Sequence, residues 1–333
     1  MKLGVVIEET WSFFKEIYQD FQEHHQTELF ERRKIKSPLF QDRLSWNAFR
    51  QDGRAFLSRN DVIFFEWASE ALANFSRLPK QNGVVTRLHR YEMYHWVDKI
   101  DWSFVDRIIV VSDAKRAEFS VHFPDHAHKL VVIPEAISLE QFPFSPRNYQ
   151  GSLGILCHLT PRKRVYELTL AFSMLVREHP HFHLHIGGGE HPRFKDYYSS
   201  LTDLVSRLGL ADKVTFHGNV SNPLAWYQQV DVFISNSYSE GLQVSPMEAM
   251  ASGCYCLSHN WPGAEQLLPS PNIYETDQQL IDLILTYDRM SHSAKNAERA
   301  SLRRLVEEKF DVNKIKGSVR EVVEDVYSQA HRK

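Results

Sequence analysis

Asp61-Val62-Ile63-Phe64-Phe65-Glu66 is a short run in which every central residue is apolar. A strand with one face in solvent alternates apolar and polar side chains, whereas a strand buried on both faces is apolar throughout. Similar runs occupy the first half of the chain at 3–7, 83–88, 106–112 and 129–134. These runs predict a parallel sheet covered by helices on both faces, which is the α/β class.

The segment 142–148 interrupts this rhythm with two prolines and polar neighbours, and it is the best candidate for a linker. The alternation then restarts, with strands expected at 153–157, 182–186, 214–216, 232–235 and 254–257, and with helices between them. We therefore expect two Rossmann-like domains, 1–146 and 147–311, facing a cleft that is the default ligand site. A last helix, within 312–333, can pack on either domain and can cross back to the N-terminal one.

Composition narrows the class of protein. The 333 residues include 43% hydrophobic residues and carry a formal net charge of −3, which excludes wholesale disorder and disfavours a general nucleic-acid binder. Three cysteines without a CxxC pair predict neither a disulfide framework nor a structural zinc site, so we expect a reducing cytoplasm. No apolar run reaches the roughly 20 residues of a membrane span, and the first residues do not resemble a signal peptide.

Two N-terminal segments bear on membrane contact. An apolar stripe at helical spacing predicts a helix over about 11–30, whose opposite face is acidic and therefore unsuited to a membrane. The following run Glu31-Arg32-Arg33-Lys34-Ile35-Lys36 is basic. A solvated loop is one interpretation, and contact with an anionic acceptor or a lipid headgroup is the other. Peripheral association with the inner face of a membrane therefore stays open.

The most informative stretch, 237–253, directly follows the expected strand 232–235. Gly241 lies in a loop before a helix that is expected to begin near Ser245 or Pro246, and the free N–H groups of such a start can bind a phosphate. Glu240 and Glu248 are two acids that can accept hydrogen bonds from the hydroxyls of a phosphorylated ligand, such as a nucleotide sugar. The alternative is purely structural, because Ser245 and Glu248 have the spacing of a capping box.

A second loop with the same position in the pattern runs from Cys157 to Arg164. Arg162, Lys163 and Arg164 are consecutive cations before a helix, where they oppose the helix dipole. An anionic ligand such as a diphosphate explains that placement, and a solvated basic loop is the alternative. No Asp-x-Asp pair is present to hold a divalent metal, so we expect these cations to do the work of a metal and no metal or other cofactor to be needed.

Taken together, these motifs resemble a family. Glu240 and Glu248 with seven residues between them, followed by Ala249-Met250-Ala251-Ser252-Gly253, resemble the E-x7-E region of retaining glycosyltransferases of family four, which have the two-domain GT-B fold. The resemblance extends to the Arg162-Lys163 loop, the run Ile186–Gly189 and Pro262-Gly263-Ala264-Glu265. It is strong over about 151–268, partial over about 83–142 and weak before that.

The resemblance implies roles for individual residues. Lys163 would contact the donor diphosphate, and His158 would stand where the family often has arginine, unless Arg162 takes over that contact. Glu248 would hold the ribose hydroxyls, Glu240 would lie by the donor sugar, and the N–H groups of Gly241 and Leu242 would face the phosphates or the sugar. His89 would be the histidine of the N-terminal domain at the reacting centre, so that His89, Glu240 and Lys163 are the expected catalytic residues.

The implied activity is a metal-independent, retaining transfer of a sugar, in the manner of a hexosyltransferase. The donor would be a UDP- or GDP-sugar bound by 147–311, and the glycan or lipid-linked acceptor would be bound by 1–146. The product would be a cell-surface polysaccharide or a glycolipid, with no nucleic-acid partner. The alternative is a GT-B protein that binds a nucleotide sugar or a partner without catalysis.

Three features complicate the expected site. The family's glycine-rich turn after the first strand is replaced by Glu8-Glu9-Thr10-Trp11, and its second loop glycine is replaced by Gln243. His179, His181, His183 and His185 alternate along the chain. They are either metal ligands on a strand or, as we favour, the half-buried polar face of that strand.

Overall fold

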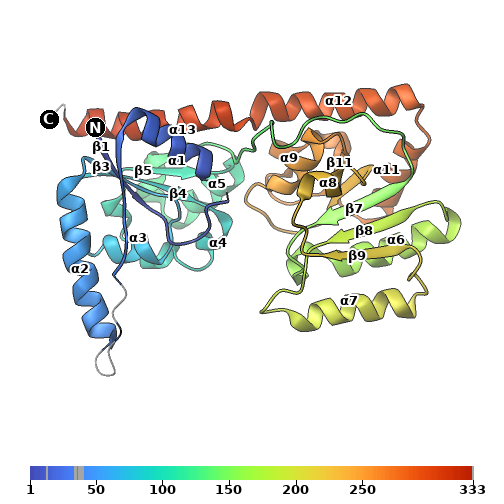
Figure 1. Ribbon diagram of the computed structural model, residues 1–333, viewed down its shortest axis with the longest axis horizontal. Helices are drawn as coiled ribbons and strands as arrows, with labels where there is room; N and C mark the ends of the chain where they lie inside the picture. The colour runs from blue at the N-terminus through green and yellow to red at the C-terminus, as the bar shows by residue number, and fades with distance from the viewer. Residues whose placement is uncertain (13, 34–35, 37–40, 332–333) are drawn as a thin grey trace. The chain divides into compact units, whose positions relative to one another are not determined.

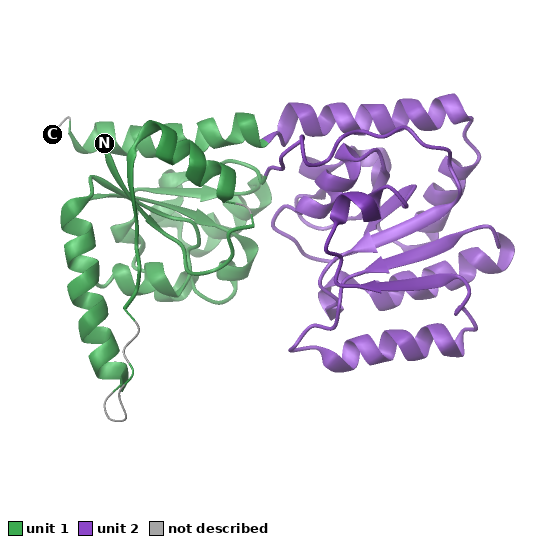
Figure 2. Cartoon of the chain, viewed as in Figure 1, with its two compact units in different colours: residues 1–135, 312–333 green, residues 136–311 purple. Residues whose placement is uncertain are grey.

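The computed structural model describes residues 1–12, 14–33, 36 and 41–331. The described residues form two compact units, each with its own parallel sheet (Figures 1 and 2). Unit 1 comprises residues 1–135 and 312–333, and unit 2 comprises residues 136–311. None of the helices in the described ranges is both long and apolar enough to cross a membrane.

Unit 1 has the parallel sheet that the apolar runs predict. Its described strands follow the order β2-β1-β3-β4-β5-β6, and they are β1 (Lys2–Val6), β2 (Gln26–Leu29), β3 (Val62–Phe65), β4 (Gly83–Leu88), β5 (Arg107–Val110) and β6 (Leu130–Val132). The side chains of β3 and β4 are buried throughout, as expected for strands covered on both faces. The carboxyl ends of β3, β4 and β6 therefore lie along one edge of this sheet.

The helices of unit 1 supply its cover. They are α1 (Lys15–His24), α2 (Gln41–Arg59), α3 (Glu70–Phe75), α4 (Arg90–Met93), α5 (Asp113–His122) and α13 (Val312–Ala330). Helix α13 packs against α1 and the sheet: Arg320 Nε donates to Asp20 Oδ2 at 2.9 Å, and Val326 lies over Gly83. A Cβ atom at Gly83 would lie 2.4 Å from Val326 Cγ1, so the glycine allows this close approach. The last helix thus crosses back to the N-terminal unit.

The structure differs from expectation in the segment 11–30 and describes only part of the basic run 31–36. The helix expected over 11–30 is wrong in length, because α1 ends at His24 and Gln26–Leu29 forms the edge strand β2 beside β1. This strand is polar and only partly buried, so the sequence contains no apolar run that would predict it. Within the basic run 31–36, residues 34–35 lie outside the described residues, whereas Arg33 pairs with Asp52.

Unit 2 repeats the architecture. Its described strands follow the order β12-β11-β10-β7-β8-β9, and they are β7 (Ser152–Leu156), β8 (His183–Gly187), β9 (Val214–Gly218), β10 (Val232–Ser235), β11 (Tyr255–His259) and β12 (Ile273–Tyr274). Its helices are α6 (Val165–Glu178), α7 (Lys195–Arg207), α8 (Pro223–Tyr227), α9 (Val244–Ala251), α10 (Ala264–Leu267), α11 (Asp277–Asp288) and α12 (His292–Lys309).

Unit 2 begins at Ala136, six residues before the proline-containing segment 142–148 that we expected to separate the domains. Residue Ile137 pairs with Asp311 in an isolated bridge, and Arg303 Nη1 donates to the carbonyl oxygen of Phe142 at 2.7 Å. These contacts attach the segment from Ala136 onward to α12, so it belongs to unit 2. Composition alone locates the prolines. It does not locate the residue at which the chain stops contacting unit 1 and begins to contact unit 2.

The strand order of unit 2 determines where its ligand site is expected. Strands β7 and β10 are neighbours, and the chain runs outward from them in opposite directions along the sheet. The loops after β7 and β10 therefore diverge at their carboxyl ends and leave a crevice, which is where doubly wound sheets bind ligands. The motif 157–164 is the first of these loops, and the motif 237–253 begins in the second and continues through α9 (Val244–Ala251).

Candidate functional site

The loop after β7 places two cations against the loop after β10. Pro161–Lys163 forms one 3-10 turn, and Arg164 then adopts a left-handed conformation (φ 50°) before α6 begins. Among the described residues it is the one non-glycine with a positive φ, a conformation that is unfavourable for a side chain of this kind. The turn directs Arg162 and Lys163 toward Glu240, and these two side chains are called the cation pair below.

Glu240 receives hydrogen bonds from both members of the cation pair. Lys163 Nζ donates to Glu240 Oε1 at 2.7 Å, and Arg162 Nη1 donates to the same oxygen. Burial alone would raise the pKa of Glu240, but the charges of Lys163 and Arg162 outweigh it and hold the pKa well below its usual range. The side chain of Arg162 is 26% exposed and that of Lys163 is 12% exposed, so the interpretation as a solvated basic loop is wrong for these two residues.

Gln243 is a third partner of Glu240 that the sequence did not single out as such. Its Nε2 donates to Glu240 Oε1 at 2.7 Å and to Ser237 Oγ at 3.1 Å, and its Oε1 accepts from the hydroxyl of Ser235. The residue that replaces the family's second loop glycine thus connects the end of β10 to the carboxylate. The hydrogen bonds from Arg162, Lys163 and Gln243 all end on Glu240 Oε1, and Ser237 also interacts with this carboxylate.

Glu248 lies on α9 and does not close the helix start. The helix begins at Val244 with Gln243 as N-cap residue, and no side chain caps it, so the alternative interpretation of Ser245 and Glu248 as a capping box is wrong. Instead, Tyr227 OH donates to Glu248 Oε2 at 2.7 Å. Burial raises the pKa of Glu248, and the hydrogen bond from Tyr227 opposes that rise.

Gly241 and Leu242 link Glu240 to this helix. Both residues are buried. In the part of the chain that the structure describes, no hydrogen bond is found to their backbone N–H groups. Together with the free N–H groups of the first turn of α9, they form a row of donors at the carboxyl end of β10. Such a row suits an anion.

His158 is half-buried in the loop after β7 and lies near the cation pair. Burial and the charge of Lys163 lower its pKa, so the imidazole is neutral near pH 7 and adds no positive charge. Its loop is held close to the glycine run after β8. A Cβ atom at Gly188 (φ 125°) would lie 1.9 Å from the carbonyl oxygen of Cys157, so only glycine fits there.

His89 belongs to unit 1, whereas the other predicted site residues belong to unit 2. It directly follows β4 and is 7% exposed. Its Nδ1 lies 2.7 Å from Glu135 Oε1, and its Nε2 lies 3.4 Å from Glu66 Oε1. The sequence did not predict either acid as part of the site, although Glu66 directly follows the apolar run 62–65 and so stands at the end of a strand.

The histidine-rich strand forms the half-buried polar face that we favoured. His183 Nε2 contacts Thr215 Oγ1 at 2.8 Å, and His185 Nδ1 contacts His217 Nε2 at 3.0 Å, between β8 and β9. Burial lowers the pKa of His185 to about 4. Within the described ranges, these histidines are not part of any group of three metal-ligating side chains.

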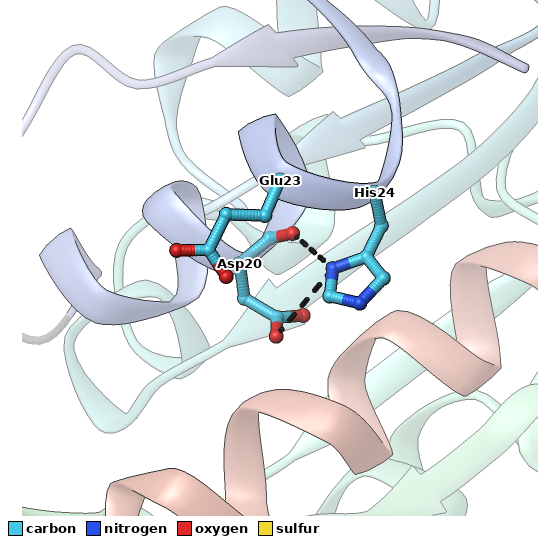
Figure 3. A group of neighbouring side chains, drawn as sticks. All are labelled: Asp20, Glu23 and His24. Atoms are coloured by element: carbon cyan, nitrogen blue, oxygen red, sulfur yellow. Dashed lines mark hydrogen bonds and ion pairs between the residues drawn. The ribbon is translucent and has the colours of Figure 1, made fainter.

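One such group is present among the described residues, in unit 1. Asp20, Glu23 and His24 bring their ligand atoms within 4.8 Å of one another (Figure 3). However, Asp20 Oδ2 already accepts from Arg320, and His24 Nδ1 contacts the backbone oxygen of Asp20 at 2.8 Å. A cation would have to displace both contacts, so the group is better described as the end of α1 anchored to α13.

Comparison with known proteins gives the same picture for the fold and for unit 2. Residues 150–281 match the sequence model of the family described as Glycosyl transferases group 1. The chain is 38% identical over 65 residues to the lipopolysaccharide core biosynthesis mannosyltransferase LpsB of Rhizobium meliloti (strain 1021), which is 20% of this chain and 18% of that protein. It is 28% identical over 162 residues to the poly(glycerol-phosphate) alpha-glucosyltransferase of Bacillus subtilis (strain 168), which is 44% of this chain and 23% of that protein.

The chain thus spans less than a quarter of the length of these two relatives, whereas it matches the following two solved structures over nearly all of theirs. The structure of Anabaena Alr3699/HepE in complex with UDP and glucose has a TM-score of 0.79 at 20% identity, covering 97% of this chain and 99% of that one. Sucrose-phosphate synthase from Thermosynechococcus elongatus has a TM-score of 0.76 at 15% identity, covering 98% and 99%. The fold is therefore the GT-B fold of glycosyltransferases that we expected. Residues 150–281 are thus similar to the family described as Glycosyl transferases group 1.

Proposed function

We propose that this protein is a glycosyltransferase that moves a sugar from a nucleotide diphosphate sugar to a hydroxyl group of an acceptor. The observation that carries the proposal is the cation pair on Glu240 at the carboxyl ends of β7 and β10. Two cations face one carboxylate there, so the cluster has a surplus positive charge. A diphosphate matches that surplus, because its charge needs cationic partners.

The donor would bind across the three elements of the site. The diphosphate would form ion pairs with Arg162 and Lys163, and its oxygens would accept hydrogen bonds from the N–H groups of Gly241 and Leu242. Glu240 Oε2 would accept from a hydroxyl of the sugar, and Glu248 Oε1 would accept from the ribose. Tyr227 supports the last role, because it holds Oε2 and so fixes the other oxygen of that carboxylate.

Metal independence is part of the proposal. When the bond between the sugar and the diphosphate breaks, negative charge develops on the departing phosphate. Arg162 and Lys163 would neutralise that charge, which is the role that a divalent cation has in other enzymes. Their position at the end of β7 supports this role, as does the partial exposure of Arg162.

We also propose that the reaction retains the configuration at the anomeric carbon. Glu240 is a weak base, because its pKa is held low by Lys163 and Arg162, and its Oε1 is occupied by three donors. It is therefore poorly suited to take the acceptor's proton or to attack the sugar. A departing phosphate oxygen would take that proton instead, with the acceptor attacking from the same face.

The acceptor would be a glycan or a lipid-linked sugar handled by unit 1. Support comes from the relatives, whose names place them in lipopolysaccharide core biosynthesis and in poly(glycerol-phosphate) glucosylation. The structural neighbours include complexes with UDP and with UDP-glucose, which favours a UDP-sugar as donor, and a GDP-sugar is the second choice. A cytoplasmic location with peripheral membrane contact would suit a lipid-linked acceptor.

A ligand screen followed by a turnover assay tests the proposal. UDP, GDP and ADP, each with its glucose or mannose conjugate, are added in the presence of EDTA, and the thermal unfolding midpoint is measured. We expect one base to raise the midpoint, with a further rise for its sugar conjugate. Binding without turnover across glycan and lipid-linked acceptors would instead identify the non-catalytic nucleotide-sugar-binding or partner-binding protein. An inverted product anomer, seen by proton NMR, would refute retention.

A further inference from the structure

Four side chains of unit 1 form a closed set of ion pairs, called the ion quartet below. Glu66 follows β3, Arg87 and His89 flank the end of β4, and Glu135 follows β6. Arg87 lies between the acids, with Nη1 2.7 Å from Glu66 Oε1 and Nη2 2.8 Å from Glu135 Oε2. His89 bridges the same two acids on its other side. Each acid therefore contacts both bases.

Because the quartet is buried, its net charge determines which protonation state of His89 is favoured. The exposed fractions are 0% for Glu66, 1% for Arg87, 4% for Glu135 and 7% for His89. Two carboxylates and one guanidinium leave one negative charge without compensation, and burying such a charge is costly. An imidazolium at His89 supplies the missing positive charge. A neutral imidazole would leave the surplus in place.

The groups around His89 reinforce this assignment. Burial alone would lower the pKa of His89, but Glu135 and Glu66 outweigh it and raise the pKa well above its ordinary value. Glu92 on α4 is fully buried and has a pKa raised by burial to about 6, so any charge on it also favours the imidazolium. From the loop after β3, the indole of Trp67 covers the imidazole, with ring centroids 4.2 Å apart.

The two ring nitrogens are held differently. Nδ1 makes a short contact to Glu135 at 2.7 Å. Nε2 makes only long ones, at 3.4 Å to Glu66 Oε1 and 3.3 Å to the backbone oxygen of Glu66. A hydrogen bond weakens as its length grows beyond about 3.2 Å. The Nε2–H group is thus the less tightly held of the two.

We propose that Glu135 and Glu66 are positioning residues that hold His89 doubly protonated, so that it offers an Nε2–H donor and a fixed positive charge to a substrate oxygen. The proposal rests on the transferase function proposed above. It assigns His89 no role as a base. The acceptor O–H and sugar–phosphate bonds would break, a sugar–acceptor bond would form, and the proton would pass to the departing phosphate.

The protonation state can be read without any assay of activity. The wild-type chain is labelled with ¹⁵N-histidine, and long-range ¹H–¹⁵N spectra are recorded between about pH 6 and pH 8.5. His89→Gln identifies the His89 signals by their loss. We expect both His89 nitrogens to keep imidazolium shifts across this range. Shifts of a neutral tautomer at pH 7.5 would overturn the proposal.

The second arm compares pH profiles of transfer. In Glu135→Gln, His89 loses its strongest partner, so its charge should be lost as the pH rises through about 6.5–7.5, near the ordinary histidine value. We expect transfer by Glu135→Gln to fall at least about tenfold between pH 6 and pH 8.5, while the wild type shows no such fall from this group. A uniform loss at every pH would mean a merely structural role for Glu135 and would count against the proposal.

Controls keep the outcomes separate. Glu324→Gln removes the acid that faces another histidine of unit 1, His25, at 3.3 Å, and it should leave the profile unchanged. His89→Gln keeps a donor near the place of Nε2 and should retain more activity than His89→Ala. If Glu135→Gln does not fold, the wild-type spectra still decide. If no donor is transferred at all while His89 is an imidazolium, the proposed function fails and the protonation assignment stands.

Discussion

The cation pair with Glu240 in unit 2 and the ion quartet in unit 1 use the same residue types and differ in charge balance. In unit 2 two cations face one carboxylate, and Arg162 is 26% exposed. In unit 1 two bases face two acids, and no side chain of the four is more than 9% exposed. A surplus charge near the surface is suited to a ligand, whereas a balanced and buried set is suited to fixing geometry.

The largest effect should come from Lys163→Ala, which removes one of the two cations and with it the surplus positive charge of the cluster. We expect kcat for sugar transfer to fall about 10²–10³-fold, as when a donor to a developing negative charge is lost elsewhere. Initial rates at saturating donor measure it. The matched control is Lys195→Ala, whose side chain is 72% exposed on α7 and should change nothing. Full activity in Lys163→Ala would leave the cation pair without a catalytic role.

A smaller effect is expected at Glu248. Glu248→Gln keeps the shape but weakens the acceptor for the ribose, which should cost about tenfold in donor affinity. The 2′-deoxy donor should bind the wild type and the variant equally well, because the hydroxyl concerned is missing. Calorimetry with both nucleotides measures the difference, with Glu178→Gln at the exposed end of α6 as control. If replacing the normal donor by its 2′-deoxy form weakens binding equally in the wild type and in Glu248→Gln, Glu248 does not bind the ribose.

Glu240 should have opposite effects on binding and on transfer. In the free protein its carboxylate pairs with the cations that a diphosphate needs. Glu240→Gln removes this internal competitor, so the bare nucleoside diphosphate should bind several-fold more tightly, while transfer falls because the sugar loses its acceptor. Titration with the nucleotide and with its sugar conjugate separates the two effects. Weaker binding of both ligands would contradict the competition.

The smallest effect concerns stability against pH. The folded-state pKa of Glu240 is depressed, so its contribution is present above the unfolded value of about 4.3 and is lost as the pH falls through the folded value. We expect the wild type to exceed Glu240→Gln by roughly 1–2 kcal/mol at pH 7, with the gap closing below about pH 4. Thermal unfolding at several pH values measures the gap. A gap that widens toward acid would reverse the sign of this contribution.

Much of the fold could be predicted because buried parallel strands are apolar at every position. The strands β4 and β10 begin and end where the sequence indicated. Strand β2 could not be found this way, because its sequence Gln26–Leu29 is polar and lies at a sheet edge. Helices α2, α11 and α12 were not singled out either, since no motif drew attention to them.

The site was predicted less completely than the fold, for a physical reason. The spacing of Glu240 and Glu248 and the basic run at Arg162 are local signals that a sequence displays. The partners are remote: Tyr227 meets Glu248 across 21 residues, and Arg87 meets Glu135 across 48. Only the strand order brings such pairs together. Gln243 was visible as a departure from the family, yet its three hydrogen bonds depend on the path of the loop after β10.

The return of α13 to unit 1 has a consequence for how the chain acquires its structure during synthesis. Unit 2 is continuous from 136 to 311, whereas unit 1 needs residues from both ends of the described chain. On the ribosome, the sheet of unit 1 must wait with Gly83 and its neighbours uncovered until Val326 has emerged. In nascent chains stalled before residue 312, unit 2 should therefore already resist protease. Unit 1 should become resistant only after the complete chain has been released.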